Sequence, residues 1–184
     1  TFPLEIIQHL IDHGHAHFGE NKVQEAVEKW KSIKETPNQI KLHMIGKLQT
    51  NKVKYVIPLF DYIHSLDNIK LAEKISKEQS KKNKSLKIFI QVNIGLESQK
   101  SGIEPNNVQN FYNKCVNDLK LNIIGLMCIP PQNNVESHFS EMQKLNHLLD
   151  LKELSMGMSD DYLQAKKYGS SFVRIGSKIF GERS

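Results

Sequence analysis

Short β-type segments alternate with helical segments along the chain, and this alternation constrains the fold more than any other feature. Seven segments have the apolar, β-rich composition of strands, at residues 15–21, 40–45, 62–66, 87–93, 123–128, 154–156 and 172–175. Helical periodicity separates them, at residues 23–33, 51–57, 68–79, 105–119, 136–149 and 160–168. Strands separated in this way are typical of parallel βαβ units. We therefore predict one α/β domain over residues 1–184 with an internal parallel sheet.

Two architectures suit such an alternation, an open doubly wound sheet of seven strands and a closed barrel of eight. The chain opens with a helix, because Pro3 precedes apolar residues at helical spacing and Gly14 follows them. Every later helix has a strand before it. We therefore predict a (β/α)8 TIM-like barrel whose first strand would precede Thr1. The doubly wound sheet stays as the alternative, because periodicity does not separate the two.

The composition argues against several other classes of protein. Apolar stretches fall far short of the roughly 20 residues that a membrane span needs, so we expect no membrane partner. The net charge is +5, but the densest basic run, residues 77–87, has no interleaved aromatic residues. That run fits a solvated helix end better than a nucleic-acid site. Cys115 and Cys128 show no paired spacing, which predicts reduced thiols and a cytoplasmic location.

Polar residues and glycines follow the ends of the predicted strands, where functional groups gather in parallel α/β folds. Near the last two of these ends, Ser155, Gly176 and Ser177 would supply two hydroxyls and an accessible backbone N–H. Barrels often bind phosphate after their last two strands. The residues therefore predict a phosphate site. This prediction alone leaves open a barrel hydrolase or isomerase that acts on a phosphorylated small molecule.

Two other groups of residues invite a chemical interpretation and are better explained as structural. Three histidines share an alternate spacing, at His13, His15 and His17. In a strand that spacing sends neighbouring side chains to opposite faces, so we predict no metal site. Three lysines are candidates for imine formation, at Lys47, Lys100 and Lys178. We interpret them as exposed lysines, with Lys100 the best placed for a secondary contact with a cofactor.

Several sequence blocks carry a family resemblance. They are FGENKVQEA (18–26), HMIGKLQTNK (43–52), IFIQVNIGLESQKSG (88–102), IIGLMCIPP (123–131), LSMGMSDD (154–161) and VRIGSKIFGER (173–183). In order and spacing these blocks resemble the pyridoxal phosphate homeostasis protein family. Such proteins are single-domain barrels related to the N-terminal domain of alanine racemase, and they bind pyridoxal 5′-phosphate (PLP) without an established turnover.

The resemblance implies roles for individual residues. Ser155, Gly176 and Ser177 would hold the phosphate, Arg174 would face the pyridine nitrogen, and Asn21 would line the ring pocket. A protonated arginine leaves the ring nitrogen unprotonated, which weakens the electron-sink character on which PLP catalysis depends. We therefore expect a non-enzymatic PLP-binding protein of intracellular vitamin B6 homeostasis, with PLP-dependent apoenzymes as possible partners.

The sequence departs from the family pattern at its start. The family's cofactor-binding lysine ends the first strand in a stretch resembling VSKT, and Thr1 stands at the threonine of that stretch. Either the sequence is a fragment that lacks this lysine, or the lysine, modified by the cofactor, stands directly before Thr1, and we hypothesise the second. The rival function is a PLP-dependent amino-acid racemase. It needs a second acid/base group from an added C-terminal domain, and the sequence ends at Ser184, soon after the last predicted strand.

Overall fold

Seven parallel strands form the centre of the computed structural model, which describes residues 2–34 and 39–181. The strands are β1 (His17–Glu20), β2 (Lys41–Met44), β3 (Tyr62–Leu66), β4 (Lys87–Val92), β5 (Ile123–Cys128), β6 (Glu153–Met158) and β7 (Phe172–Arg174). All seven predicted strands are therefore present. Thr1, and with it the strand and lysine predicted to precede it, lies outside the described residues.

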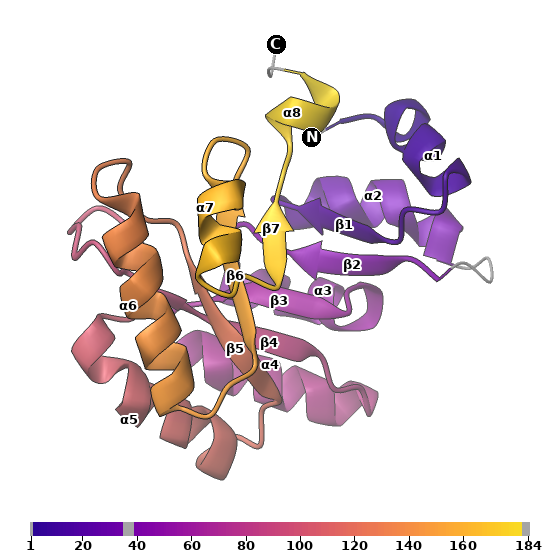
Figure 1. The fold of residues 1–184 in the computed structure, drawn as a ribbon. Coiled ribbons are helices and arrows are strands. Elements are labelled where there is room, and N and C mark those ends of the chain that lie inside the picture. The colour runs from indigo at the N-terminus through magenta and orange to yellow at the C-terminus, as the bar shows by residue number, and fades with distance from the viewer. Residues whose placement is uncertain (1, 35–38, 182–184) are drawn as a thin grey trace.

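The strands pair in chain order from β1 to β7, and every pair is parallel. A doubly wound sheet would reverse its strand order at a switch point, so this order excludes that alternative. The sheet curls until its first and last strands approach, and the rings of His17 and Phe172 lie 6.4 Å apart. The fold is a nearly closed TIM-like barrel, as predicted (Figure 1).

Helices connect the strands and cover the outside of the barrel (Figure 1). They are α1 (Leu4–Asp12), α2 (Val23–Lys34), α3 (Val53–Leu59), α4 (Ile69–Lys82), α5 (Val108–Asn113), α6 (Val135–Leu148), α7 (Tyr162–Lys167) and α8 (Ser177–Phe180). Three short turns of other helix types adjoin them, η1 (Thr50–Lys52), η2 (Pro105–Asn107) and the π-helical η3 (Lys114–Asp118).

Two predicted helix boundaries were wrong. Pro58 lies inside α3, which ends one residue later at Leu59, because a proline near the end of a helix interrupts little that follows. The helix predicted over residues 105–119 divides into η2, α5 and η3, and the Leu119 N–H closes a π-type turn on the carbonyl of Lys114. The basic run ends α4 at a left-handed Asn83, as expected for a solvated helix end.

One hydrophobic core joins the outer face of the sheet to the helices, with Trp30, Phe60 and Phe139 among its fully buried members. A second, smaller cluster of Tyr62, Phe89 and Met127 lies on separate strands, with Phe172 packed against it. In the part of the chain that the structure describes, no helix has the length and apolarity to span a membrane.

Candidate functional site

A pocket of about 360 Å³ opens where four strands end. Its lining comes from the residues that follow β1 and β2, from the end of β4 with the loop after it, and from Ile129 after β5. In a parallel barrel these ends meet at one mouth. This mouth is therefore the candidate functional site, and Asn21, predicted to line a ring pocket, is among its lining residues.

The position of Asn21 depends on a glycine of the neighbouring strand end. A Cβ atom added to Gly46 would collide with the carbonyl oxygen and Cα of Asn21. The backbone N–H groups of Ile45 and Gly46 both donate to the carbonyl of Glu20, at 3.0 and 3.4 Å. The loop after β1 thus packs directly on the loop after β2, because Gly46 has no side chain.

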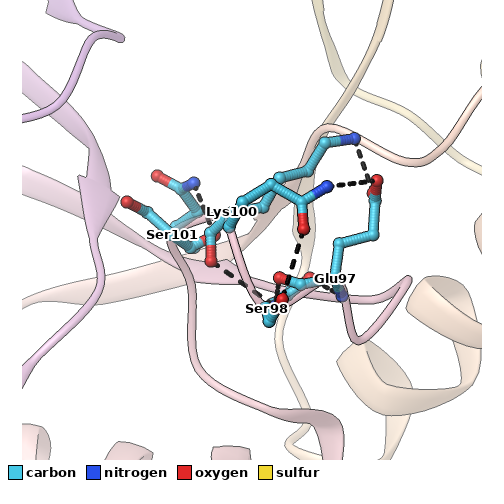
Figure 2. Close-up of polar contacts among 7 residues, drawn as sticks. Glu97, Ser98, Lys100 and Ser101 are labelled. Carbon is cyan, nitrogen blue, oxygen red and sulfur yellow. Dashed lines mark hydrogen bonds and ion pairs between the residues drawn. The ribbon is translucent and has the colours of Figure 1, made fainter.

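The long loop after β4 forms the opposite wall of the pocket and is held by its own polar groups (Figure 2). The Asn93 side chain donates to the carbonyl of Glu97 at 2.9 Å and accepts from the Glu97 N–H at 3.2 Å. Gln91 donates to the carbonyl of Ser101 at 3.0 Å. Lys100 pairs with the Glu97 carboxylate at 2.6 Å. These contacts fix the loop that presents Lys100 and Ser101 to the pocket.

Arg174, the last residue of β7, directs its guanidinium toward the neighbouring strands. Nη1 donates to the carbonyl oxygen and to Oγ of Ser155, at 2.9 and 2.8 Å, and Nη2 donates to the carbonyl of Cys128 at 2.8 Å. These bonds use both Nη1 hydrogens and one Nη2 hydrogen. Among the described residues, the Nε hydrogen and the second Nη2 hydrogen have no hydrogen-bond partner.

Ser155 lies under Arg174 in the barrel interior. It is fully buried, and its Oγ also lies 2.8 Å from Nδ1 of His64. Its hydroxyl is therefore already bonded on two sides.

Burial lowers the pKa of Arg174, which stays protonated as arginines do, and it raises the pKa of the Cys128 thiol to about 12. Burial likewise raises the pKa of Cys115 to about 12, so both free thiols are unreactive core groups.

Gly176 and Ser177 follow β7 at the start of α8, where Gly176 is the N-cap residue. Space is open around Gly176, since a Cβ added there would meet nothing within 4 Å. The structure thus brings Ser155 and Arg174 into contact and places Gly176 and Ser177 just beyond Arg174, at the barrel mouth. Ser159 was not among the predicted site residues; it is buried and directly follows the last residue of β6. The sequence could have indicated this residue, because Ser159 is the second serine of SMGMS (155–159), close to the end of a predicted strand.

Two of the three candidate lysines, Lys47 and Lys100, line the pocket. Lys100 also pairs with Glu97, and Lys178 Nζ lies 5.0 Å from the centre of the Tyr162 ring. Among the described residues, no group of three or more acidic, histidine or cysteine side chains is arranged to bind a metal ion. His13 bonds the carbonyl of His9 instead.

Together the fold and the site define a class: a TIM-like barrel whose strand ends carry a polar pocket and a guanidinium that neighbouring strands hold in place. The family model for the N-terminal domain of alanine racemase matches residues 3–184. The pyridoxal phosphate homeostasis protein of Aquifex aeolicus is 38% identical over 193 residues, which cover all of this chain and 84% of that protein. The chain therefore belongs to the pyridoxal phosphate homeostasis protein family, within the alanine racemase N-terminal domain group.

Solved structures agree with this assignment. PipY of Synechococcus elongatus without PLP has a TM-score of 0.91 and 31% identity, with 98% of this chain and 89% of that chain covered. PipY with PLP bound has a TM-score of 0.86, 30% identity and the same coverage.

Proposed function

We propose that this protein binds PLP at the carboxyl-terminal mouth of the barrel and serves intracellular PLP homeostasis without catalytic turnover. The observation that carries the proposal is the guanidinium of Arg174, which is fixed by three hydrogen bonds to neighbouring strands and keeps N–H donors for a ligand. A pyridine nitrogen is an acceptor of the kind that these donors suit. The family membership and the PLP-bound PipY structure support the same ligand.

The residues around the mouth fit the rest of the cofactor. Asn21 would line the side of the ring, on a loop whose position Gly46 fixes. The backbone N–H of Gly176 and the hydroxyl of Ser177 would bind the phosphate, since open space surrounds Gly176. Ser159 would add a hydroxyl from the loop after β6. Ser155 would act indirectly, because both Arg174 and His64 already bond its hydroxyl.

The chemistry of Arg174 explains why such a site would hold PLP without turning it over. PLP supplies an aldehyde that reacts with amines and a ring that withdraws electrons when its nitrogen is protonated. Arginine stays protonated and would donate to the ring nitrogen, which would therefore remain unprotonated. The site would bind and orient the ring but not activate it. A reactive aldehyde kept in this way would be available to PLP-dependent apoenzymes, the partners that we propose.

Binding of three related compounds tests the proposal. Calorimetric titrations of the full-length protein with PLP, with pyridoxal and with inorganic phosphate should show that PLP binds most tightly. Pyridoxal lacks the phosphate and should bind more weakly, and phosphate should compete only at higher concentration. Borohydride reduction followed by peptide mapping then locates any lysine that holds the cofactor. Equal binding of PLP and pyridoxal would contradict the phosphate site, and no binding of PLP would contradict the function.

A racemisation assay separates this proposal from the rival enzyme. The full-length protein should racemise alanine no faster than the same concentration of free PLP. Turnover well above that rate would assign the chain to the racemases instead.

A further inference from the structure

A line of polar side chains crosses the barrel interior, and its three histidines have no role in the proposed binding of PLP. His17 Nδ1 lies 2.9 Å from His43 Nε2, and His43 Nδ1 lies 2.9 Å from His64 Nε2. His64 Nδ1 then lies 2.8 Å from Ser155 Oγ, which accepts from Arg174. We call His17, His43 and His64 the histidine file. The file runs from β1 through β2 to β3, and Ser155 on β6 joins it to Arg174 on β7.

The file connects the two ends of the barrel. His17 is the first residue of β1 and is exposed, whereas Arg174 is the last residue of β7, at the opposite mouth. Between them His43 is 5% exposed, His64 is 2% exposed and Ser155 is fully buried. Tyr62 stacks on His43 with ring centres 4.1 Å apart, and Phe89 stacks on His64 at 4.3 Å. These aromatic rings hold the imidazoles in place and exclude water.

The groups around the file keep its rings neutral. Burial lowers the pKa of His43 to about 3 and that of His64 well below its ordinary value. His17 faces His15, Lys41, Lys87, His43 and the carboxylate of Asp61. Asp61 also faces His43, and Arg174 faces His64. The pKa of His17 is lowered too, by partial burial and then by its cationic neighbours, which outweigh Asp61.

Arg174 sets the direction of every hydrogen bond in this line. A neutral imidazole has one donor and one acceptor nitrogen, so the whole file donates in one direction or the other. Ser155 Oγ accepts from Arg174, and the only other described partner for its hydroxyl is His64. The hydroxyl hydrogen therefore donates to His64 Nδ1, because a buried hydroxyl hydrogen without an acceptor is unfavourable. Each ring then carries its proton on Nε2, so that His64 donates to His43 and His43 donates to Nδ1 of His17.

We propose that Ser155 and the histidine file form a directional hydrogen-bond relay that positions Arg174 and couples it to the opposite mouth of the barrel. Ser155, His64, His43 and His17 are positioning residues in this relay. The coupling lowers the proton affinity of His17. Its Nδ1 accepts a hydrogen bond from His43, so this nitrogen has no lone pair available for a second proton. Protonation of His17 requires either that all hydrogen bonds of the file reverse their direction or that the bond between His17 and His43 breaks. Ser155 opposes the reversal, because its hydroxyl hydrogen would then have no acceptor.

Nitrogen NMR of full-length protein labelled in its histidines tests the relay directly. In the wild type, all three rings of the file should carry the proton on Nε2. Ser155→Ala removes the hydroxyl through which Arg174 sets the direction, with little change in volume. In this variant His17, three hydrogen bonds away, should become a mixture of tautomers and gain about tenfold in proton affinity. The Ser170→Ala control removes a hydroxyl that bonds the carbonyls of β6 but does not touch the file.

The outcomes separate a relay from simple packing. A proton on Nδ1 of His17 in the wild type would overturn the proposal, and this result does not depend on the folding of any variant. Changes confined to His64 in Ser155→Ala would also overturn it. The effect on the cofactor rests on the proposed function: PLP should bind Ser155→Ala about tenfold more weakly and Ser170→Ala normally. If the wild type does not bind PLP, the proposed function fails while the tautomers still decide the relay.

Discussion

The Nη2 atom of Arg174 lies 2.8 Å from the carbonyl oxygen of Cys128, and this bond connects β7 to β5 across the intervening strand. Nη1 of the same side chain bonds Ser155 on β6. One guanidinium thus joins three neighbouring strands. Arg174 therefore has a structural role as well as its proposed role toward the cofactor, and substitutions must be judged on both.

Arg174→Lys should impair both roles. A lysine ammonium keeps the charge but lacks the planar fork that reaches Ser155 and Cys128 together. We expect the free energy of unfolding to fall by about 1.5–3 kcal/mol, the range for hydrogen bonds to a charged group. PLP affinity should fall about tenfold or more. Urea denaturation and PLP titration measure the two effects, with Lys152→Arg, at an exposed position, as the control. Wild-type affinity in Arg174→Lys would exclude a contact with the ring nitrogen.

Asn93→Ala should loosen the loop that forms one wall of the pocket. The Asn93 side chain bonds both the N–H and the carbonyl of Glu97. Their loss should lower the local opening free energy by about 1–2 kcal/mol. Hydrogen exchange measured by mass spectrometry should then speed up in residues 94–101. Gln109→Ala on α5 is the control, and unchanged exchange in the loop would contradict this account.

The sequence predicted the fold better than it predicted the site. Strand and helix periodicity is local, so all seven strands could be recognised, and their alternation implied the parallel order. Ser155 was predicted at the end of a strand, but it lies inside β6. Four consecutive residues of β6 are buried, so its sequence lacks the alternation of apolar and polar residues that would show which side chains point into the barrel. The contact of Ser155 with Arg174 and the histidine file depends on barrel curvature. Residues 21 and 26 positions apart meet there, and no local pattern indicates that.

Acid should destabilise this protein through its buried histidines before its carboxylates take part. His43 and His64 stay neutral in the folded state because burial lowers their pKa values, that of His43 to about 3, from an ordinary value of 6.5. Below pH 6.5 the unfolded chain binds protons that the folded chain does not. Stability is therefore complete above pH 6.5 and is lost as the pH falls toward 3, by up to about 1.4 kcal/mol per pH unit for each histidine.

Urea denaturation between pH 6.5 and 5 measures this loss, since the carboxylates with lowered pKa values titrate below that range. His64→Phe should reduce the slope of stability against pH by about a third to a half, because the lowered pKa of His17 also contributes to the slope. His147→Gln, exposed on α6, should leave the slope as it is. An unchanged slope in His64→Phe would show that His64 is protonated in the folded protein.

Gly46→Ala should damage the ring side of the pocket through the fold. The added methyl group would collide with the backbone of Asn21, so the loops after β1 and β2 must separate. We expect the free energy of unfolding to fall by about 1–3 kcal/mol, as in overpacked cores, together with weaker binding of both PLP and pyridoxal. Thermal denaturation and calorimetric titration provide the two measurements. Unaltered stability would mean that the loop moves without cost.

Gly176→Ala should give the opposite combination, an intact fold with a damaged phosphate site. A methyl group at Gly176 meets nothing within 4 Å, so the free energy of unfolding should stay within about 0.5 kcal/mol of the wild type. The same methyl group would occupy the space through which a phosphate approaches the backbone N–H. PLP affinity should therefore fall about tenfold while pyridoxal affinity stays unchanged, because pyridoxal has no phosphate. An equal loss for both compounds would place Gly176 beside the ring, and no loss for either would remove it from the site.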